Sequence, residues 1–308
     1  MTEISCSPHI HSNETTTKIM WSVIIALLPA TLASIYFFGL DALKVIIVCI
    51  ISCYIGEVIS HFVFSRRFRS FDGSEVVTGI LLSFVLPPSI PLWMAGIGGF
   101  LAIFLVKELF GGIGFNIFNP ALAARAILTV SFPLEMTQFN APLSYRVDAI
   151  TTATPLGILK EGVGGQLPSL WQMFIGNRAG CIGETSIILL LIGAIFLLCR
   201  KIITWHIPIS YILTVALLTG IAGQNPLFHI LAGGLILGAF FMATDYVTSP
   251  ITPKGKIIFG IGCGIITSLI RFKGSYPEGV AYSIIFMNMF VPLIDRYTIP
   301  KKFGVIKK

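Results

Sequence analysis

The clearest capacity for chemistry lies in a hydroxyl-rich segment, residues 148–155, which reads Asp-Ala-Ile-Thr-Thr-Ala-Thr-Pro. A threonine hydroxyl can be esterified to a phosphate when its backbone is extended and accessible. Pro155 disfavours the helical conformation for the residue before it, so we expect Thr154 to be extended and accessible. Thr151 and Thr152 are rival acceptors in the same segment. On these residues alone, an ordinary solvated turn is the alternative.

A second candidate is the glycine-rich stretch 176–185, which leads into an apolar segment. Backbone N–H groups and the positive end of the helix dipole favour a phosphate at such an entry. Arg178 adds a formal positive charge and Gly180 keeps the backbone open, so the stretch predicts a cradle for a phosphate held at Thr154. An ordinary loop entering a helix is the alternative.

Polar residues in and beside the apolar segments form a third group. Asn119, followed by proline, is typical of a helix start. Arg125 comes two turns later, at a depth where an arginine needs a partner or a cavity. Asp245, with Asp72 and Thr248, lies near the end of an apolar segment. These residues predict an inner pocket for a ligand or an ion, and helix capping is the alternative.

Two further patterns bear on ion or metal chemistry. Glu57 and His61 are four residues apart and share a helix face. They predict either a step for a proton or sodium ion or a contact with a partner subunit. The six cysteines contain no CxxC pair. Cys49 and Cys53 alone are too few to hold an iron–sulfur cluster, so no metal site is predicted.

The composition shows what must position these residues. Of the 308 residues, 55% are hydrophobic and 11% charged, and the mean hydropathy is +0.88. A soluble domain carries about a quarter charged residues. The apolar runs are continuous, which excludes the alternating pattern of a β-barrel. We therefore expect an all-α polytopic membrane protein.

Runs long enough to cross a bilayer, about 20 residues or somewhat fewer in broken helices, give about ten transmembrane helices. The third and fifth are short and interrupted by proline or glycine. The predicted spans are 19–38, 42–63, 75–87, 92–109, 119–132, 184–199, 207–222, 226–243, 257–271 and 278–294.

Basic residues set the expected orientation. A cytoplasmic N-terminus places fourteen of the 21 lysines and arginines inside. Both termini are then cytoplasmic, and the long loop that contains Thr154 is extracytoplasmic. The net charge of +7 is explained by topology and anionic lipids, not by nucleic-acid binding. The resulting division is a cytoplasmic tail (1–18), a first membrane half (19–132), the outer loop (133–183), a second membrane half (184–294) and a basic cytoplasmic tail (295–308).

A weak internal echo predicts an inverted repeat with broken helices. The sequence Val-Thr-Gly at 77–79 and the glycine pair at 98–99 recur as Leu-Thr-Gly at 218–220 and the pair at 233–234. Five spans in each half make the two halves inverted, as in many transporters.

Several motifs resemble one membrane-protein family over nearly the whole chain. The motifs are Ser7-Pro8-His9, Thr17-Lys18-Ile19-Met20, Phe71-Asp72-Gly73-Ser74, Lys107-Glu108-Leu109-Phe110-Gly111-Gly112, Phe118–Arg125 and Met242-Ala243-Thr244-Asp245. They are similar to the D subunits of Rnf ion-translocating ferredoxin:NAD oxidoreductase complexes (RnfD). The related B subunits of sodium-pumping NADH:quinone reductases (NqrB) begin with a longer extension, so RnfD is the better match.

In this family, a segment resembling Asp148–Thr154 receives FMN from a flavin transferase through a phosphoester bond. The resemblance places the bond on Thr154, beside Asp148, Thr151, Thr152 and Ala153. Thr152 departs from the usual pattern, which has glycine there. The resemblance also implies a non-covalent riboflavin within the membrane part. Partner subunits would carry a further FMN, iron–sulfur clusters and the NAD site.

The chain is therefore expected to be an electron-carrying subunit of an inner-membrane translocase, not a complete enzyme. Its electrons would pass between flavins and drive Na⁺ or H⁺ translocation. A small-solute or ion permease without flavin is the main alternative, because it would share the spans and the broken helices. A purely structural assembly subunit is a third possibility.

Overall fold

A computed structural model describes residues 14–64, 72–143, 152–161, 167–184, 186–274 and 276–300. Within these ranges the chain is all-helical and contains no strand. Each of the ten predicted apolar segments contains a helix. Three helices are long and apolar enough to cross a bilayer on their own, and four shorter apolar helices accompany them. The predicted all-α membrane class is confirmed.

The first half begins with two long helices, α1 (Thr16–Phe38) and α2 (Leu40–Val63). Two short helices, α3 (Ser74–Phe84) and α5 (Pro120–Ser131), flank α4 (Leu92–Leu101). A π-helical stretch, η1 (Ala102–Glu108), continues α4. The third and fifth apolar segments are short, as predicted. Asn119 caps α5 as expected, because its side-chain oxygen accepts the N–H groups of Ala121 and Leu122.

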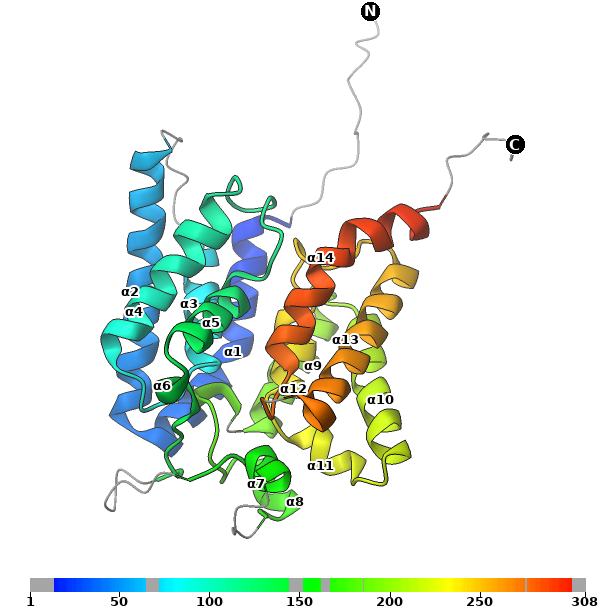
Figure 1. The fold of residues 1–308 in the computed structure, drawn as a ribbon. Coiled ribbons are helices and arrows are strands. Elements are labelled where there is room, and N and C mark those ends of the chain that lie inside the picture. The colour runs from blue at the N-terminus through cyan, green and yellow to red at the C-terminus, as the bar shows by residue number, and fades with distance from the viewer. Residues whose placement is uncertain are drawn as a thin grey trace, which may run out of the picture.

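The connecting region contains short helices that the hydropathy pattern did not predict. They are α6 (Pro133–Thr137), α7 (Pro155–Glu161), α8 (Leu170–Ile175) and the 3-10 turn η3 (Ile182–Glu184). Figure 1 shows α7 and α8 at one end of the molecule, and the start of α1 and the end of α14 at the opposite end.

The second half has α9 (Ile187–Cys199) and α10 (His206–Ile221), followed by a broken segment. This segment consists of α11 (Pro226–Leu231), α12 (Leu235–Leu237) and the π-helical η4 (Gly238–Met242). The last two helices are α13 (Pro253–Lys273) and α14 (Val280–Thr298). Helix α14 extends past 294, so the predicted basic tail begins inside a helix.

The packing of the first half recurs in the second. Helix α2 packs against α3 and α4, and α10 packs against α11 and α13. The equivalent first helices, α1 and α9, contact each other, and so do the equivalent last helices, α5 and α14. A two-fold relation between the halves produces this pattern. It supports the predicted repeat.

The sequence echo used to predict that repeat is wrong in register. Gly79 lies in α3, the third helix of its half, whereas Gly220 lies in α10, the second helix of the other half. Their surroundings also differ. A Cβ on Gly79 would lie 2.7 Å from the Cα of Ile50, but a Cβ on Gly220 would meet Pro226 at 3.5 Å.

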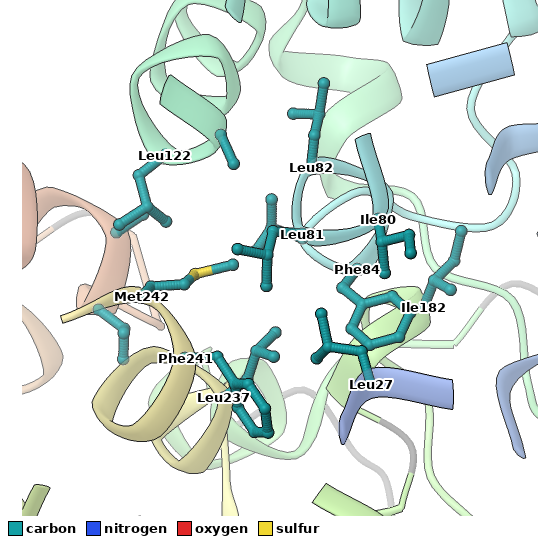
Figure 2. Close-up of a cluster of buried hydrophobic side chains, with 14 of the residues drawn as sticks. Leu27, Ile80, Leu81, Leu82, Phe84, Leu122, Ile182, Leu237, Phe241 and Met242 are labelled. Carbon is teal, nitrogen blue, oxygen red and sulfur yellow. The ribbon is translucent and has the colours of Figure 1, made fainter. Parts of the chain in front are cut away.

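The core lies between the two halves and positions both candidate sites. Figure 2 shows side chains from both halves converging there, among them Leu27, Leu81, Leu122, Phe241 and Met242. In a bilayer, lipid is as apolar as these side chains, so close packing provides much of the cohesion. Helices α1 and α9 cross at close range. A Cβ on Gly193 would lie 2.1 Å from the carbonyl oxygen of Ala26.

Candidate functional site

Thr154 stands immediately before α7, at the end of the molecule that bears the connecting region. Its hydroxyl accepts a hydrogen bond from the N–H of Gly157 at 3.2 Å, and its carbonyl accepts the N–H of Ile158 at 2.9 Å. The side chain therefore acts as a helix cap. Thr154 is 6% exposed, so the expectation of an accessible hydroxyl is wrong. Capping draws the hydroxyl against the first turn of α7.

The neighbours of Thr154 differ from it in exposure. Thr152 and Ala153 are exposed, and the N–H of Thr152 donates to the carbonyl of Phe139 at 2.9 Å. Asp148 and Thr151 lie outside the described residues, so their predicted contribution to the site stays a prediction. Thr152 is the more accessible of the two described hydroxyls and is a rival acceptor on this ground.

Arg178 is buried beneath this region, and its donors are used inside the chain. Its guanidinium donates to the carbonyl oxygens of Glu184, at 2.7 Å and 3.3 Å, and of Leu231. Gly180 packs against the Glu184 side chain, where a Cβ would lie 2.9 Å from Oε2. These contacts favour the structural alternative for the stretch. The phosphate role of Arg178 and Gly180 stays a prediction.

Arg125 lies in a second buried group on the same side. Its guanidinium forms an ion pair with Glu278 and lies 3.7 Å from the Cys181 sulfur. The ligand atoms of Cys181, Glu184 and Glu278 lie within 4.8 Å of one another. Arg125 already pairs with one of the two carboxylates, that of Glu278, so this group does not resemble a cation site. Arg125 thus has the partner that its depth requires.

Arg271, in the last turn of α13, was not predicted from the sequence. Its guanidinium donates to the carbonyls of His229 (2.6 Å), Ala232 (3.0 Å) and Glu278 (3.1 Å). Since it is followed by Lys273 at a helix end, its sequence context is that of an ordinary interfacial cation. We name Arg125, Arg178, Arg271, Glu184 and Glu278 the outer charge cluster, after the extracytoplasmic side on which the distribution of basic residues predicts this end of the molecule.

Two arginines of the outer charge cluster stabilise the break after α11. The last carbonyls of a helix have no partner within it and carry a partial negative charge. Arg178 and Arg271 supply donors to those carbonyls. Gly233 and Gly234 then turn the chain with φ of 64° and 63°, a region that glycine adopts without strain. Leu156 of α7 packs on this turn, with its Cδ1 2.4 Å from where a Cβ on Gly233 would lie.

A cavity of about 110 Å³ lies towards the opposite end, between the two halves. It is lined mainly by apolar side chains, with Asn119, Asp245, Ser74 and Lys107 among the polar ones. The Asp245 carboxylate accepts the Thr248 hydroxyl at 3.0 Å, and burial raises the pKa of Asp245. The structure thus brings Asn119 and Asp245 together as predicted, and it places Arg125 elsewhere.

A buried acidic group borders this cavity. The Lys107 ammonium donates to Glu57 at 2.9 Å and to the Ser74 hydroxyl at 2.7 Å. It also lies 3.7 Å from Glu75 and 3.8 Å from Glu108. We name Glu57, Glu75, Lys107 and Glu108 the inner charge cluster. Lys107 itself is buried.

Glu57 and His61 do share a helix face, with 3.9 Å between Nε2 and the carboxylate. The stronger partner of Glu57 is Lys107 in the same chain. The negative charge of Glu57 is therefore balanced by Lys107 of the same chain, and it does not require a partner subunit. No spacing rule links Glu57 to Lys107, since α2 and η1 meet only in the folded chain.

Comparison with known proteins identifies the family. A family model described as NQR2, RnfD, RnfE family matches residues 3–304. The chain belongs to this family. The resemblance expected from the sequence motifs is confirmed.

Three relatives show how close the match is. The D subunit of a proton-translocating ferredoxin:NAD(+) oxidoreductase complex from Clostridium ljungdahlii is 51% identical, covering 98% of this chain and 96% of the relative. Its Na(+)-translocating counterpart from Acetobacterium woodii is 48% identical, with 99% and 96% covered. The D subunit of an ion-translocating oxidoreductase complex from Stutzerimonas stutzeri is 38% identical, with 93% and 92% covered. The names of the first two specify different ions.

Proposed function

We propose that this chain is the membrane subunit of an ion-translocating ferredoxin:NAD⁺ oxidoreductase complex and that it passes electrons between flavins. The observation that carries the proposal is the family match, with relatives named as D subunits of such complexes at 51% and 48% identity over almost their full length. The neighbouring subunits would supply the NAD site and the iron–sulfur clusters. The coupling ion is Na⁺ or H⁺.

Thr154 is the proposed attachment point of a covalent FMN. The geometry fits an ester, because the Thr154 oxygen acts only as an acceptor towards the Gly157 N–H. An esterified oxygen has no proton to donate but keeps its lone pairs, so this contact can persist after modification. Since Thr154 is 6% exposed, the flavin transferase must meet a state in which the start of α7 has opened.

The inner cavity is the proposed site of the non-covalent riboflavin. Its walls are mainly apolar. Its volume of about 110 Å³ is smaller than that of most small-molecule sites, about 300–1,000 Å³, so riboflavin would have to widen it on binding. Asp245 provides a carboxylate at its edge. Asn119 is less available, because its amide already caps α5 and donates to the Met242 carbonyl at 3.3 Å.

When bound, the flavins would accept and donate the electrons, and the chain would determine their positions. A tether at Thr154 prevents the loss of a cofactor on the side from which a cell cannot recover it. The buried charges set the field around each flavin and thereby its potential. Moving one charge against 100 mV costs about 2.3 kcal/mol, so each step must release at least that much per ion.

Intact-mass measurement of the denatured chain from the purified, flavin-transferase-matured complex tests the attachment. The wild-type chain should exceed its sequence mass by FMN less one water. Thr154→Val should lose this increment, and Thr152→Val should keep it. If only Thr152→Val loses the mass increment, the FMN is attached to Thr152 and not to Thr154. An unmodified, colourless wild-type chain would contradict the flavin proposal and favour the permease.

A further inference from the structure

A second cavity, of about 150 Å³, adjoins the inner cavity. Four residues line both cavities: Ile202, Ile203, Thr244 and Tyr246. The second cavity borders the surface of the chain at Ile251, which is 76% exposed. We name it the entry cavity, and its remaining lining residues are Thr204, Ile207, Ser249, Pro250 and Lys256.

The entry cavity lies at the end of the molecule that bears the start of α1 and the end of α14. The segments that lead into α10 and α13 border it. Figure 1 shows the end of α14 here, and the hydroxyl of Thr298 in α14 lies 2.6 Å from that of Thr252, which caps α13. The distribution of basic residues predicts that this end faces the cytoplasm. The entry cavity therefore lies on the side from which a cytoplasmic ligand would arrive.

Tyr246 stands at the boundary between the two cavities. Its hydroxyl donates to the carbonyl oxygen of Ile202, and each of these two residues lines both cavities. The bond joins the segment after η4 to the loop between α9 and α10. Tyr246 is 54% exposed, and a side chain exposed to this degree changes rotamer readily once its hydrogen bond is released. The boundary can thus open without repacking of the core.

The two cavities differ in the surface that they offer to a ligand. The inner cavity is mainly apolar, whereas Thr204 and Lys256 border only the entry cavity and share a hydrogen bond of 3.3 Å. Riboflavin combines a planar aromatic ring with a polyhydroxyl chain, and the inner cavity alone is too small for it. Together the two cavities approach the lower end of the range for small-molecule sites, about 300 Å³.

We propose that the two cavities form one flavin site and that Tyr246 is the latch between them. The inference rests on the proposed riboflavin pocket. The apolar ring belongs in the inner cavity, and the hydroxylated chain belongs in the entry cavity with Thr204 and Lys256. One ligand can occupy both cavities only when Tyr246 releases the Ile202 carbonyl, so this hydrogen bond competes with riboflavin.

Binding of labelled riboflavin to the purified complex, after dilution has depleted its own non-covalent flavin, tests this assignment. Tyr246→Phe lacks only the hydroxyl, so it should bind riboflavin faster and about fivefold more tightly, the effect of one hydrogen bond. The rate of release should not change, because this bond is already broken in the bound state. Tyr297→Phe is the matched control, since Tyr297 is 80% exposed, lines neither cavity and should change nothing.

Lumiflavin separates the two parts of the site, because it has the ring without the hydroxylated chain. It needs only the inner cavity, so Tyr246→Phe should leave its affinity unchanged. Unchanged or weaker binding of riboflavin to Tyr246→Phe, or equal tightening of both flavins, would overturn the inference while the riboflavin pocket stands. A wild-type complex from which acid extracts no riboflavin would overturn both.

Discussion

The two buried charge clusters have opposite balances. Counting each described group as ionised, the outer charge cluster has three arginines and two glutamates, and the inner charge cluster has one lysine and three glutamates. The outer cluster therefore favours an anion, such as a phosphate or a reduced flavin. The inner cluster favours a cation. We propose the covalent flavin near the outer cluster and the riboflavin pocket near the inner cluster.

The clusters also differ in what holds their cations. Arg178 and Arg271 are bound mainly by backbone carbonyls, which cannot change charge. Lys107 is bound by carboxylates and one hydroxyl, and carboxylates can take up protons. The contacts of Arg178 and Arg271 thus keep the same charge, whereas the contacts of Lys107 can change theirs.

The largest effect is expected from Lys107→Met. This change removes the cation shared by Glu57 and Glu75, and breaking a buried ion pair by removing one partner costs about 3–5 kcal/mol. Thermal unfolding of the detergent-solubilised complex, followed by the loss of its size-exclusion peak, measures the effect. Lys107→Arg keeps the charge and should lose less. Equal stability of Lys107→Met and the wild type would contradict the role of Lys107 as the central cation.

Glu278→Gln should have the next largest effect, about 2–3 kcal/mol, because it removes the ionic partner of buried Arg125. It also raises the positive excess of the outer cluster. The same thermal assay applies. If Glu278→Gln were more stable than the wild type, the net positive charge of the outer cluster would be smaller than the count of three arginines and two glutamates gives.

Gly233→Ala tests how α7 is seated on the outer cluster, with an expected loss of about 1–2 kcal/mol from the left-handed backbone alone. The added Cβ would also lie 2.4 Å from Leu156. Gly223→Ala is the matched control, since Gly223 has a φ of 75° and nothing within 4 Å of an added Cβ. Leu156→Ala should partly rescue Gly233→Ala but not Gly223→Ala. Equal losses without rescue would contradict close seating of α7.

The smallest effect is expected from Glu75→Gln, a change within about 1 kcal/mol. Glu75 is 1% exposed, and its Oε2 has no hydrogen-bond partner among the described residues. Removing its charge reduces the acidic excess of the inner cluster. Glu75→Gln and Glu278→Gln each neutralise one buried glutamate, so measuring both in the same assay compares the two clusters directly. A loss as large as that of Glu278→Gln would remove the distinction between the clusters.

Local signals in the sequence predicted much of the fold. Each of the ten continuous apolar runs contains a helix, and Asn119 before proline marked the start of α5. The shortness of the third and fifth segments followed from proline and glycine. The short helices of the connecting region were missed because they lack a long apolar run, and capping and packing determine them.

The sites were less predictable, because their partners are distant in the sequence. The inner cavity was anticipated from Asn119 and Asp245, which lie near segment ends. The pairing of Arg125 with Glu278 spans 153 positions, and no periodicity predicts it. Arg178 was correctly noticed as unusual, but its carbonyl partners come from a helix break whose geometry exists only in the folded chain.

The contact between Gly193 and Ala26 limits how this protein can work. Many carriers with inverted repeats operate by rocking one repeat against the other as rigid bodies. Here the backbones of α1 and α9 are in direct contact at Gly193 and Ala26. Rocking that moved these two helices apart would break this contact. Any rigid-body motion of one half against the other would therefore have to turn about this crossing, with α1 and α9 kept together.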